Sequence, residues 1–212
     1  MFNFVDIHTH NINSTNQYAI INLKLDEIQD KLDLSKHEYF SIGIHPWDVH
    51  RFDSKMMQTI EKHAFNGKVK AIGECGLDKN SEATLKAQMD AFEKQILIAE
   101  NILKPVIVHC VGYFNELISM KKILKPSQAW IIHGFRGKPE LAKQLIMSGF
   151  YISYGEKLNI QSVKITPLEK ICIETDESSV PIEEIYKNIA TIKSCNFQDL
   201  DTASTLFDFN EC

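Results

Sequence analysis

A chain of 212 residues with 44% hydrophobic and 24% charged residues can bury a sizeable core, and no linker-like segment divides it, so we expect one domain over residues 1–212. The formal net charge of −5, with only two arginines, excludes a protein that attracts nucleic acid through an overall basic charge. No apolar run reaches the roughly 18 residues of a membrane span, and the first residues lack a signal-peptide pattern. We therefore expect a cytoplasmic protein with no membrane contact and no obligate protein partner.

The five cysteines form no C-x-x-C pair. Cys75, Cys110 and Cys172 lie in apolar segments, where cysteine is a small core residue. This usage predicts reduced thiols in a reducing compartment, not a disulfide framework or a zinc ribbon.

The first apolar segment carries three side chains that can bind a metal ion. Asp6, His8 and His10 follow one another at a spacing of two, and alternate residues of a strand lie on one face. Two imidazoles with a carboxylate suit a divalent cation. Asp6 could bind the ion directly or orient one of the imidazoles.

Further strand-like apolar segments follow, and most are separated by segments with helical periodicity. The strand-like segments comprise residues 17–23, 39–44, 69–73, 105–110, 129–133, 150–153 and 171–176. The segments with helical periodicity comprise residues 24–34, 81–101, 181–193 and 198–207. Two more helices are indicated by their ends: one has Ser54 as its N-cap, and the other has Pro139 in its first turn and Gly149 as its stop. Residues 105–110 are continuously apolar, as in parallel strands buried on both faces. Eight strands separated mostly by helices predict an α/β fold, a compact (β/α)8 barrel.

Side chains that can bind metals gather at the C-terminal ends of these strands, where barrels of this class carry their active sites. They are His8, His10, His45, Glu74, His109, His133 and Asp176. We expect them to converge on a metal site. A carboxylate such as Glu74, buried between glycines and apolar residues, would be costly without a cation beside it. We expect the remaining histidines, His37, His50 and His63, to be solvated.

Three further polar residues lie near these candidates. Arg136, three positions after His133, could grip a phosphate or carboxylate through its guanidinium fork. Glu174 lies two residues before Asp176, and we expect it to be a structural hydrogen-bond acceptor. We expect Asp78 to cap a loop.

Six motifs in this order resemble the TatD family of metal-dependent deoxyribonucleases, within the amidohydrolase superfamily. They are DIHTH (6–10), GIHPW (43–47), AIGECGLD (71–78), PVIVHC (105–110), HGFRG (133–137) and IETD (173–176). The resemblance implies a barrel with two divalent metal ions. It assigns one ion to His8, His10, Glu74 and Asp176, and the second to Glu74 as a bridging carboxylate, His109 and His133. It also places His45 at a position that faces the substrate phosphate. The identity of the ions, Zn, Mn or Mg, stays open.

The chain departs from the family in its loops. It is shorter than is usual, and the segment between DIHTH and GIHPW is compressed. Lys79-Asn80 replaces aromatic residues usual after GLD, Val111-Gly112 replaces an Arg-Asp segment, and Ser178 replaces a proline. None of these positions is a metal ligand, so the departures affect the prediction of the substrate and leave the predicted metal chemistry unchanged.

We expect a hydrolase that cleaves DNA phosphodiesters with a metal-activated water, with Asp176 and Glu74 as catalytic residues and His45 and Arg136 binding the substrate. A barrel hydrolase of small phosphoesters, amides or lactones is an alternative. The histidinol-phosphatase-like PHP class also opens on D-x-H-x-H but usually has a different order of later ligands. A non-catalytic metal-binding module is a further alternative, disfavoured because a module without a catalytic role needs no open two-metal site.

Overall fold

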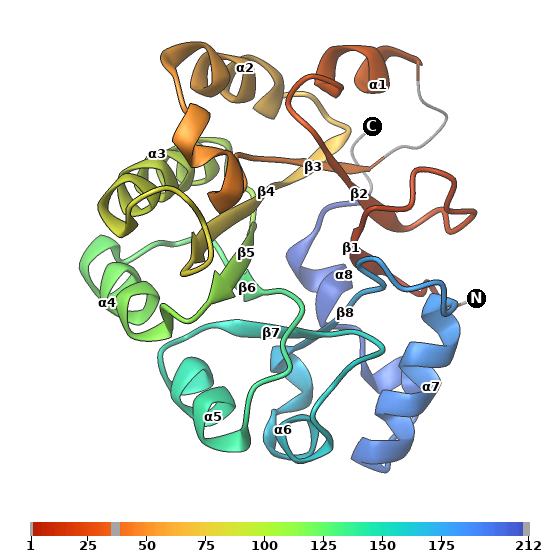
Figure 1. The fold of residues 1–212 in the computed structure, drawn as a ribbon. Coiled ribbons are helices and arrows are strands. Elements are labelled where there is room, and N and C mark those ends of the chain that lie inside the picture. Colours follow the sequence, from red (N-terminus) through yellow and green to blue (C-terminus); the bar gives the residue numbers. More distant parts are fainter. Residues whose placement is uncertain (1, 35–38, 210–212) are drawn as a thin grey trace.

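A computed structural model describes residues 2–34 and 39–209 and shows a barrel of parallel strands (Figure 1). One eight-stranded sheet runs in sequence order. Its strands are β1 (Asp6–Thr9), β2 (Ala19–Leu23), β3 (Phe40–Ile42), β4 (Val69–Asp78), β5 (Val106–Val111), β6 (Trp130–Ile132), β7 (Tyr151–Tyr154) and β8 (Ile171–Ile173). A parallel bridge between Thr9 and Asp176 joins the two edges, so the sheet closes on itself. The predicted (β/α)8 barrel is confirmed.

Helices surround this ring of strands (Figure 1). They are α1 (Ile28–Leu34), α2 (Ser54–Ala64), α3 (Leu85–Ile102), α4 (Phe114–Leu124), α5 (Pro139–Met147), α6 (Ile160–Ile165), α7 (Ile182–Lys193) and α8 (Thr202–Leu206), with 3-10 turns η1 (Pro46–Arg51), η2 (Leu168–Lys170) and η3 (Phe197–Asp199). Within the described ranges, no helix is long and apolar enough to cross a lipid bilayer.

The structure corrects several element boundaries. The N-cap of α2 is Asp53, not Ser54, because the Asp53 side chain accepts a hydrogen bond from the backbone of Met56. Strand β4 continues past Gly73 to residue 78, so Glu74 lies inside a strand and not after one. Helices α4 and α6 were not predicted, and the helix expected over 24–34 begins at residue 28.

The interior of the barrel is built in layers that position the polar residues. An apolar layer contains Ile20, Ile107, Ile131 and Cys172, one each from β2, β5, β6 and β8. Two residues further along the same segments lie Asn22, His109, His133 and Glu174. Because alternate residues of a strand face the same side, these polar residues continue the inward rows toward the C-terminal mouth. Ala203 of α8 and Phe207 join the apolar layer and close the opposite end.

Candidate metal centre

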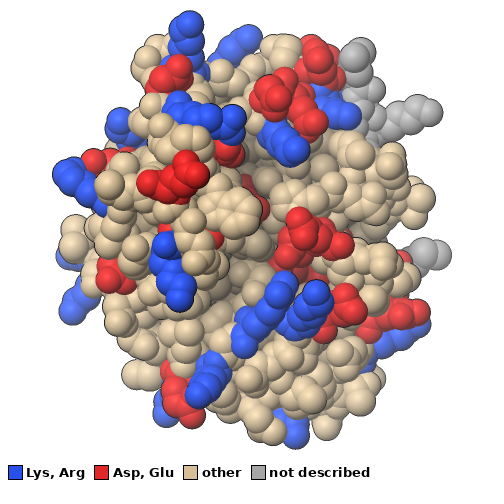
Figure 2. All heavy atoms as spheres, viewed as in Figure 1, with Lys and Arg blue, Asp and Glu red and all other residues tan. Residues whose placement is uncertain are grey.

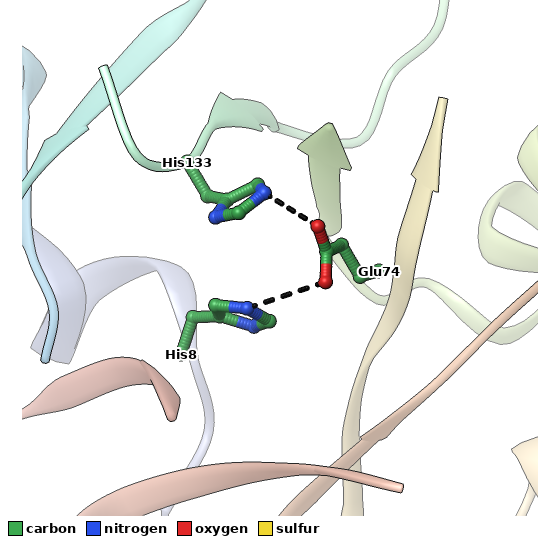
Figure 3. Close-up of side chains that lie close together, drawn as sticks. All are labelled: His8, Glu74 and His133. Carbon is green, nitrogen blue, oxygen red and sulfur yellow. Dashed lines mark ion pairs between the residues drawn. The ribbon is translucent and has the colours of Figure 1, made fainter. Parts of the chain in front are cut away.

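Glu74 lies at the centre of the polar cluster, and its two carboxylate oxygens face different sets of histidines. The side chain is 7% exposed, and its backbone N–H donates to Asn22 Oδ1 at 2.9 Å. Oε2 lies 3.5 Å from His8 Nε2 and 3.6 Å from His10 Nε2. Oε1 lies 2.7 Å from both His109 Nδ1 and His133 Nε2. Figure 3 shows His8 and His133 approaching opposite oxygens of this carboxylate.

Asp176 joins the first of these sets through the closure of the barrel. Its Oδ1 lies 3.9 Å from His8 Nε2 and 3.7 Å from His10 Nε2. Its backbone N–H donates to the His8 carbonyl, and its own carbonyl accepts from the His10 N–H. The residue has φ +55°, a left-handed conformation that Asp tolerates better than most side chains. Barrel closure therefore fixes this carboxylate beside the two histidines of the first strand.

Carboxylates behind His109 and His133 determine which ring nitrogen faces the cluster. Asp78 Oδ2 lies 3.1 Å from His109 Nε2, so in a neutral, metal-binding ring the proton stays on Nε2 and the Nδ1 lone pair faces the cluster. Without an ion, the same Nδ1 donates to Glu74 Oε1 at 2.7 Å. Glu174 Oε1 lies 3.6 Å from His133 Nδ1, beyond hydrogen-bond distance, and its negative charge favours the proton on Nδ1 of the neutral ring. Such outer carboxylates orient metal-binding imidazoles and raise their basicity.

His45 has the opposite arrangement. Its Nδ1 accepts the backbone N–H of Trp47 at 3.1 Å, so the neutral ring carries its proton on Nε2. That nitrogen lies 3.3 Å from Glu74 Oε1. A protonated ring nitrogen donates hydrogen bonds and has no lone pair for a metal ion, so His45 is suited to an oxygen of a carboxylate or a phosphate.

Glycines allow the strands around Glu74 to approach closely. Gly76 has φ +147°, and a Cβ atom built there would lie 2.0 Å from the His109 carbonyl oxygen. Gly73 has φ +143°, and its Cβ would lie 2.5 Å from the Ile107 carbonyl oxygen. Side chains at either position would push β4 away from β5 and separate Glu74 from His109.

The close contacts within the cluster shift the pKa values of Glu74 and His133. Burial raises the pKa of Glu74, but the positive charge of His133 and hydrogen bonds from His10, His109 and His133 hold it well below its usual range. Burial lowers the pKa of His133, and the charges of Glu74 and Glu174 overcome this and hold it well above its ordinary value. Without a bound cation, the buried carboxylate is therefore stabilised by protonated imidazole.

The donor set fits a divalent metal ion. Both ring nitrogens of His8 are buried without a hydrogen-bond partner, an unfavourable state that a coordinated ion would relieve. Overlapping groups of ligand atoms, each within 4.8 Å of one another, join His8, Glu74 and His133, and also His8, His10 and Asp176. His45 lies within the same distance of Glu74 and His109 but presents a protonated nitrogen. Imidazole and carboxylate donors suit zinc and related divalent ions.

Most sequence-predicted site residues meet in this cluster, and Asp6 does not contact an imidazole. All six predicted metal ligands and His45 lie in it. Asp6 instead accepts hydrogen bonds from the backbone and hydroxyl of Thr175 and from the backbone of His8, because it lies below the cluster in the barrel. Burial raises its pKa to about 7. It neither faces an ion nor orients a ring, and it links β1 to the segment after β8.

Arg136 lies outside the cluster but beside it. It is exposed and lines a pocket of about 270 Å3 together with Lys157, Glu174 and Asp176. Among the other histidines, His50 is exposed, His63 is half-buried on α2, and His37 lies outside the described residues.

The roles of Asp78 and Asn22 in the cluster were not expected from the sequence. The predicted cap at Asp78 is present, because Oδ1 accepts the Asn80 N–H at 2.8 Å. Its other oxygen contacts both His109 and the Trp47 indole. The G-L-D spacing after Glu74 carried a signal for Asp78, whereas a lone asparagine such as Asn22 in an apolar strand carried none.

Comparison with known proteins identifies the family. Residues 6–205 match the model of the TatD-related DNase family. The chain belongs to this family. It is 26% identical over 189 residues to an uncharacterised metal-dependent hydrolase, YabD, of Bacillus subtilis, covering 79% of this chain and 74% of that protein. It is 30% identical over 174 residues to the 3′-5′ ssDNA/RNA exonuclease TatD of Escherichia fergusonii, covering 76% of this chain and 67% of that protein.

Solved TatD-family structures share the barrel. The chain superimposes on YjjV, a TatD homologue from Escherichia coli K12, with a TM-score of 0.84 and 19% identity, over 97% of this chain and 98% of that one. A TatD-family hydrolase from Entamoeba histolytica gives a TM-score of 0.72 at 17% identity, with the same coverage of both chains. The predicted family and its class, a metal-dependent hydrolase, are confirmed.

Proposed function

We propose that this TatD-family hydrolase cleaves phosphodiester bonds of DNA with the help of two divalent metal ions. The proposal rests on the Glu74 carboxylate, whose two oxygens face separate groups of donors. A carboxylate shared in this way suits a pair of ions, as in two-metal sites that act on phosphate esters.

The donors divide into two sets around this carboxylate. His8, His10 and Asp176 with Glu74 Oε2 would hold one ion, and His109 Nδ1 and His133 Nε2 with Glu74 Oε1 would hold the other. When bound, zinc, manganese or magnesium ions make water a stronger nucleophile and offset the negative charge of a phosphate. Glu74 would thus act by fixing both ions in place.

The remaining residues handle the proton and the substrate. The Asp176 side chain is 25% exposed, unlike the buried Glu74, so it can accept a proton from a water entering from the mouth. His45 can direct its Nε2–H to a phosphate oxygen, and Arg136 at the pocket wall can bind phosphate through two parallel hydrogen bonds. These local contacts would compensate for a net charge of −5.

Two further observations support the substrate and the setting. The family is described as TatD-related DNase, and similar proteins from enterobacteria are named as exonucleases of single-stranded DNA and RNA. Cys75, Cys110, Cys172 and Cys195 are free, as expected of a protein that works in the reducing cytoplasm.

The test is an activity panel on metal-loaded protein. Single-stranded DNA, duplex DNA, RNA and small phosphoesters are each incubated with enzyme reconstituted with zinc, manganese or magnesium. We expect DNA hydrolysis that chelation abolishes and added metal restores. Hydrolysis of small phosphoesters alone would replace the nuclease proposal, and full DNA cleavage in verified metal-free protein would refute the metal mechanism.

A further inference from the structure

Trp47 is exposed at the mouth of the barrel, beside the metal centre. It lies two residues after His45 and is the second residue of η1, and it is 58% exposed. Among the exposed large hydrophobic residues in the described part of the chain, the only other aromatic one is Phe65. Phe65 ends α2, which leads into the start of β4, so it lies at the opposite end of the barrel.

Several contacts hold the Trp47 indole in one position. Its Nε1–H donates to Asp78 Oδ2 at 2.7 Å, the oxygen that also contacts His109. Its backbone N–H donates to His45 Nδ1, and the two rings pack edge to face with centroids 5.2 Å apart. An exposed aromatic ring fixed in this way loses little conformational entropy when a ligand binds to it.

The base of η1 is also fixed. Pro46 is buried, and its carbonyl accepts the Ser81 hydroxyl at 2.7 Å. Val49 is buried, whereas Asp48 and Arg51 form an ion pair at the surface. Trp47 therefore has polar neighbours in η1, and it does not belong to the kind of broad apolar patch that marks a protein-docking surface.

A fixed, exposed indole next to a phosphate-hydrolysing centre suits a planar ligand. Nucleobases stack on aromatic side chains, and this contact needs no positive charge. Figure 2 shows lysine and arginine side chains scattered over the face around the central hollow, without a continuous basic band. On a protein with net charge −5, stacking can supply affinity that the electrostatic field does not.

We propose that Trp47 stacks on an unpaired nucleobase of the strand whose phosphate lies at the metal centre. A base inside a duplex is already stacked on both faces, so this contact selects single strands and tolerates any base. The inference rests on the proposed function for the identity of the reacting phosphate. The stacking itself can be measured without turnover.

The two tryptophans of the chain allow a direct binding measurement. Trp130 is fully buried, so a change in indole fluorescence on ligand binding reports Trp47. Metal-loaded protein is titrated with a cleavage-resistant phosphorothioate oligothymidylate, and with a matched phosphorothioate strand whose sugars lack bases. We expect quenching by the thymine-bearing strand only. Equal quenching by the abasic strand would overturn the proposal.

Kinetics separate stacking from a structural role. We expect Trp47→Ala to raise KM for single-stranded DNA about five- to 150-fold, the range of one base stacked on an aromatic ring, with kcat nearly unchanged. Trp47→Phe should recover most of this loss, because it keeps a ring while losing the hydrogen bond to Asp78. If Trp47→Phe is as impaired as Trp47→Ala and both bind less metal, Trp47 only positions Asp78, and the proposal is wrong.

Matched controls complete the test. Phe65→Ala removes a comparably exposed aromatic ring from the opposite end and should leave KM unchanged. On an unmodified abasic strand, the difference in KM between wild type and Trp47→Ala should disappear. If wild type cleaves no nucleic acid at all, the proposed nuclease function fails, while quenching by the phosphorothioate strand still decides whether a base stacks on Trp47.

Discussion

The protonation of three imidazoles separates metal donors from substrate donors in the centre. His109 and His133 have carboxylates behind them, whereas His45 accepts a backbone N–H on the nitrogen that faces away from the cluster. The sequence shows equivalent histidines at three strand ends. Only the hydrogen bonds and nearby charges of the folded chain distinguish the rings that can turn a lone pair toward a metal ion from the ring that presents a proton.

Asp78 should control metal affinity without being a ligand. Replacing it in Asp78→Asn removes the negative charge that stabilises the Nε2 proton of His109, so we expect metal affinity to fall about 10- to 100-fold. Titration against a competing chelator measures this. Asp90→Asn is the matched control, because Asp90 forms its ion pair with Lys86 on the exposed face of α3. Unchanged affinity in Asp78→Asn would show that His109 does not need this carboxylate.

Glu74 and Asp176 should differ in how much metal they retain. Glu74→Gln weakens both groups of donors, whereas Asp176→Asn affects only the group with His8 and His10. We expect Glu74→Gln to contain close to no metal and Asp176→Asn to keep at least one ion per chain, as measured by elemental analysis of purified protein. Two ions per chain in Glu74→Gln would contradict the bridging arrangement.

Arg136 should act on the substrate and not on the metal. We expect Arg136→Ala to keep its metal content and to lose roughly ten- to a thousandfold in kcat/KM on a phosphodiester, the effect of one charge-assisted contact. Arg136→Lys should recover part of this, because it keeps the charge but not the planar fork. Lys86→Ala, which removes one charge from an exposed site on α3, controls for net charge. Near-normal turnover in Arg136→Ala would make it a solvated loop residue.

At the scale of elements, strands were easier to predict than helices. Continuous apolar segments such as residues 105–110 are a strong signal because strands buried on both faces contain few polar residues. Helix α4 is harder to predict because Tyr113 provides no side-chain cap and because the exposed Ile123 interrupts the amphipathic pattern. Helix α6 is only six residues long, and its one clear sequence signal is Asn159, whose side chain caps it.

Glu74 shows why strand ends are hard to place. The G-E-C-G sequence resembles the start of a loop, since two glycines interrupt the apolar pattern. In the fold, these glycines allow β4 and β5 to lie in close contact, and β4 continues to residue 78. A single sequence cannot distinguish a glycine that ends a strand from one that lets two strands approach.

Gly76 should therefore be critical for stability. Gly76→Ala would place a Cβ atom 2.0 Å from the His109 carbonyl oxygen at φ +147°, and we expect a loss of about 3 kcal/mol or more in the free energy of unfolding. Gly149→Ala is the matched control, because Gly149 also has positive φ, but its Cβ would contact only the Lys121 side chain at 3.5 Å. We expect roughly 1–2 kcal/mol there. Similar losses in urea unfolding of the two variants would show that the close contact does not matter.

For the whole molecule, the position of the site could be predicted, and its internal contacts could not. Topology dictates that the C-terminal ends of parallel strands meet at one mouth, which brings His8, His109 and His133 together without knowledge of any distance. The links through Asn22 and Asp78 depend on strand register and side-chain geometry. The same topology lets the site connect β1 and β4 with β5, with the residue after β6 and with the segment after β8.

Metal removal should therefore lower the stability of the entire barrel. An ion that binds only the folded chain and is present at 100 times its dissociation constant adds about 2.7 kcal/mol. For a chain of this length each kcal/mol shifts Tm by roughly 2–4 °C, so we expect chelation to lower Tm by roughly 5–10 °C for each ion removed. Differential scanning calorimetry of metal-loaded and chelated protein measures the shift. Glu74→Gln should melt at the same temperature with and without chelator, because both groups of donors share the carboxylate that it replaces. If wild type melts at the same temperature when metal-loaded and when chelated, although metal analysis shows bound ions in the loaded sample, the ions do not stabilise the folded barrel. The proposed binding of the ions by this cluster would then be wrong.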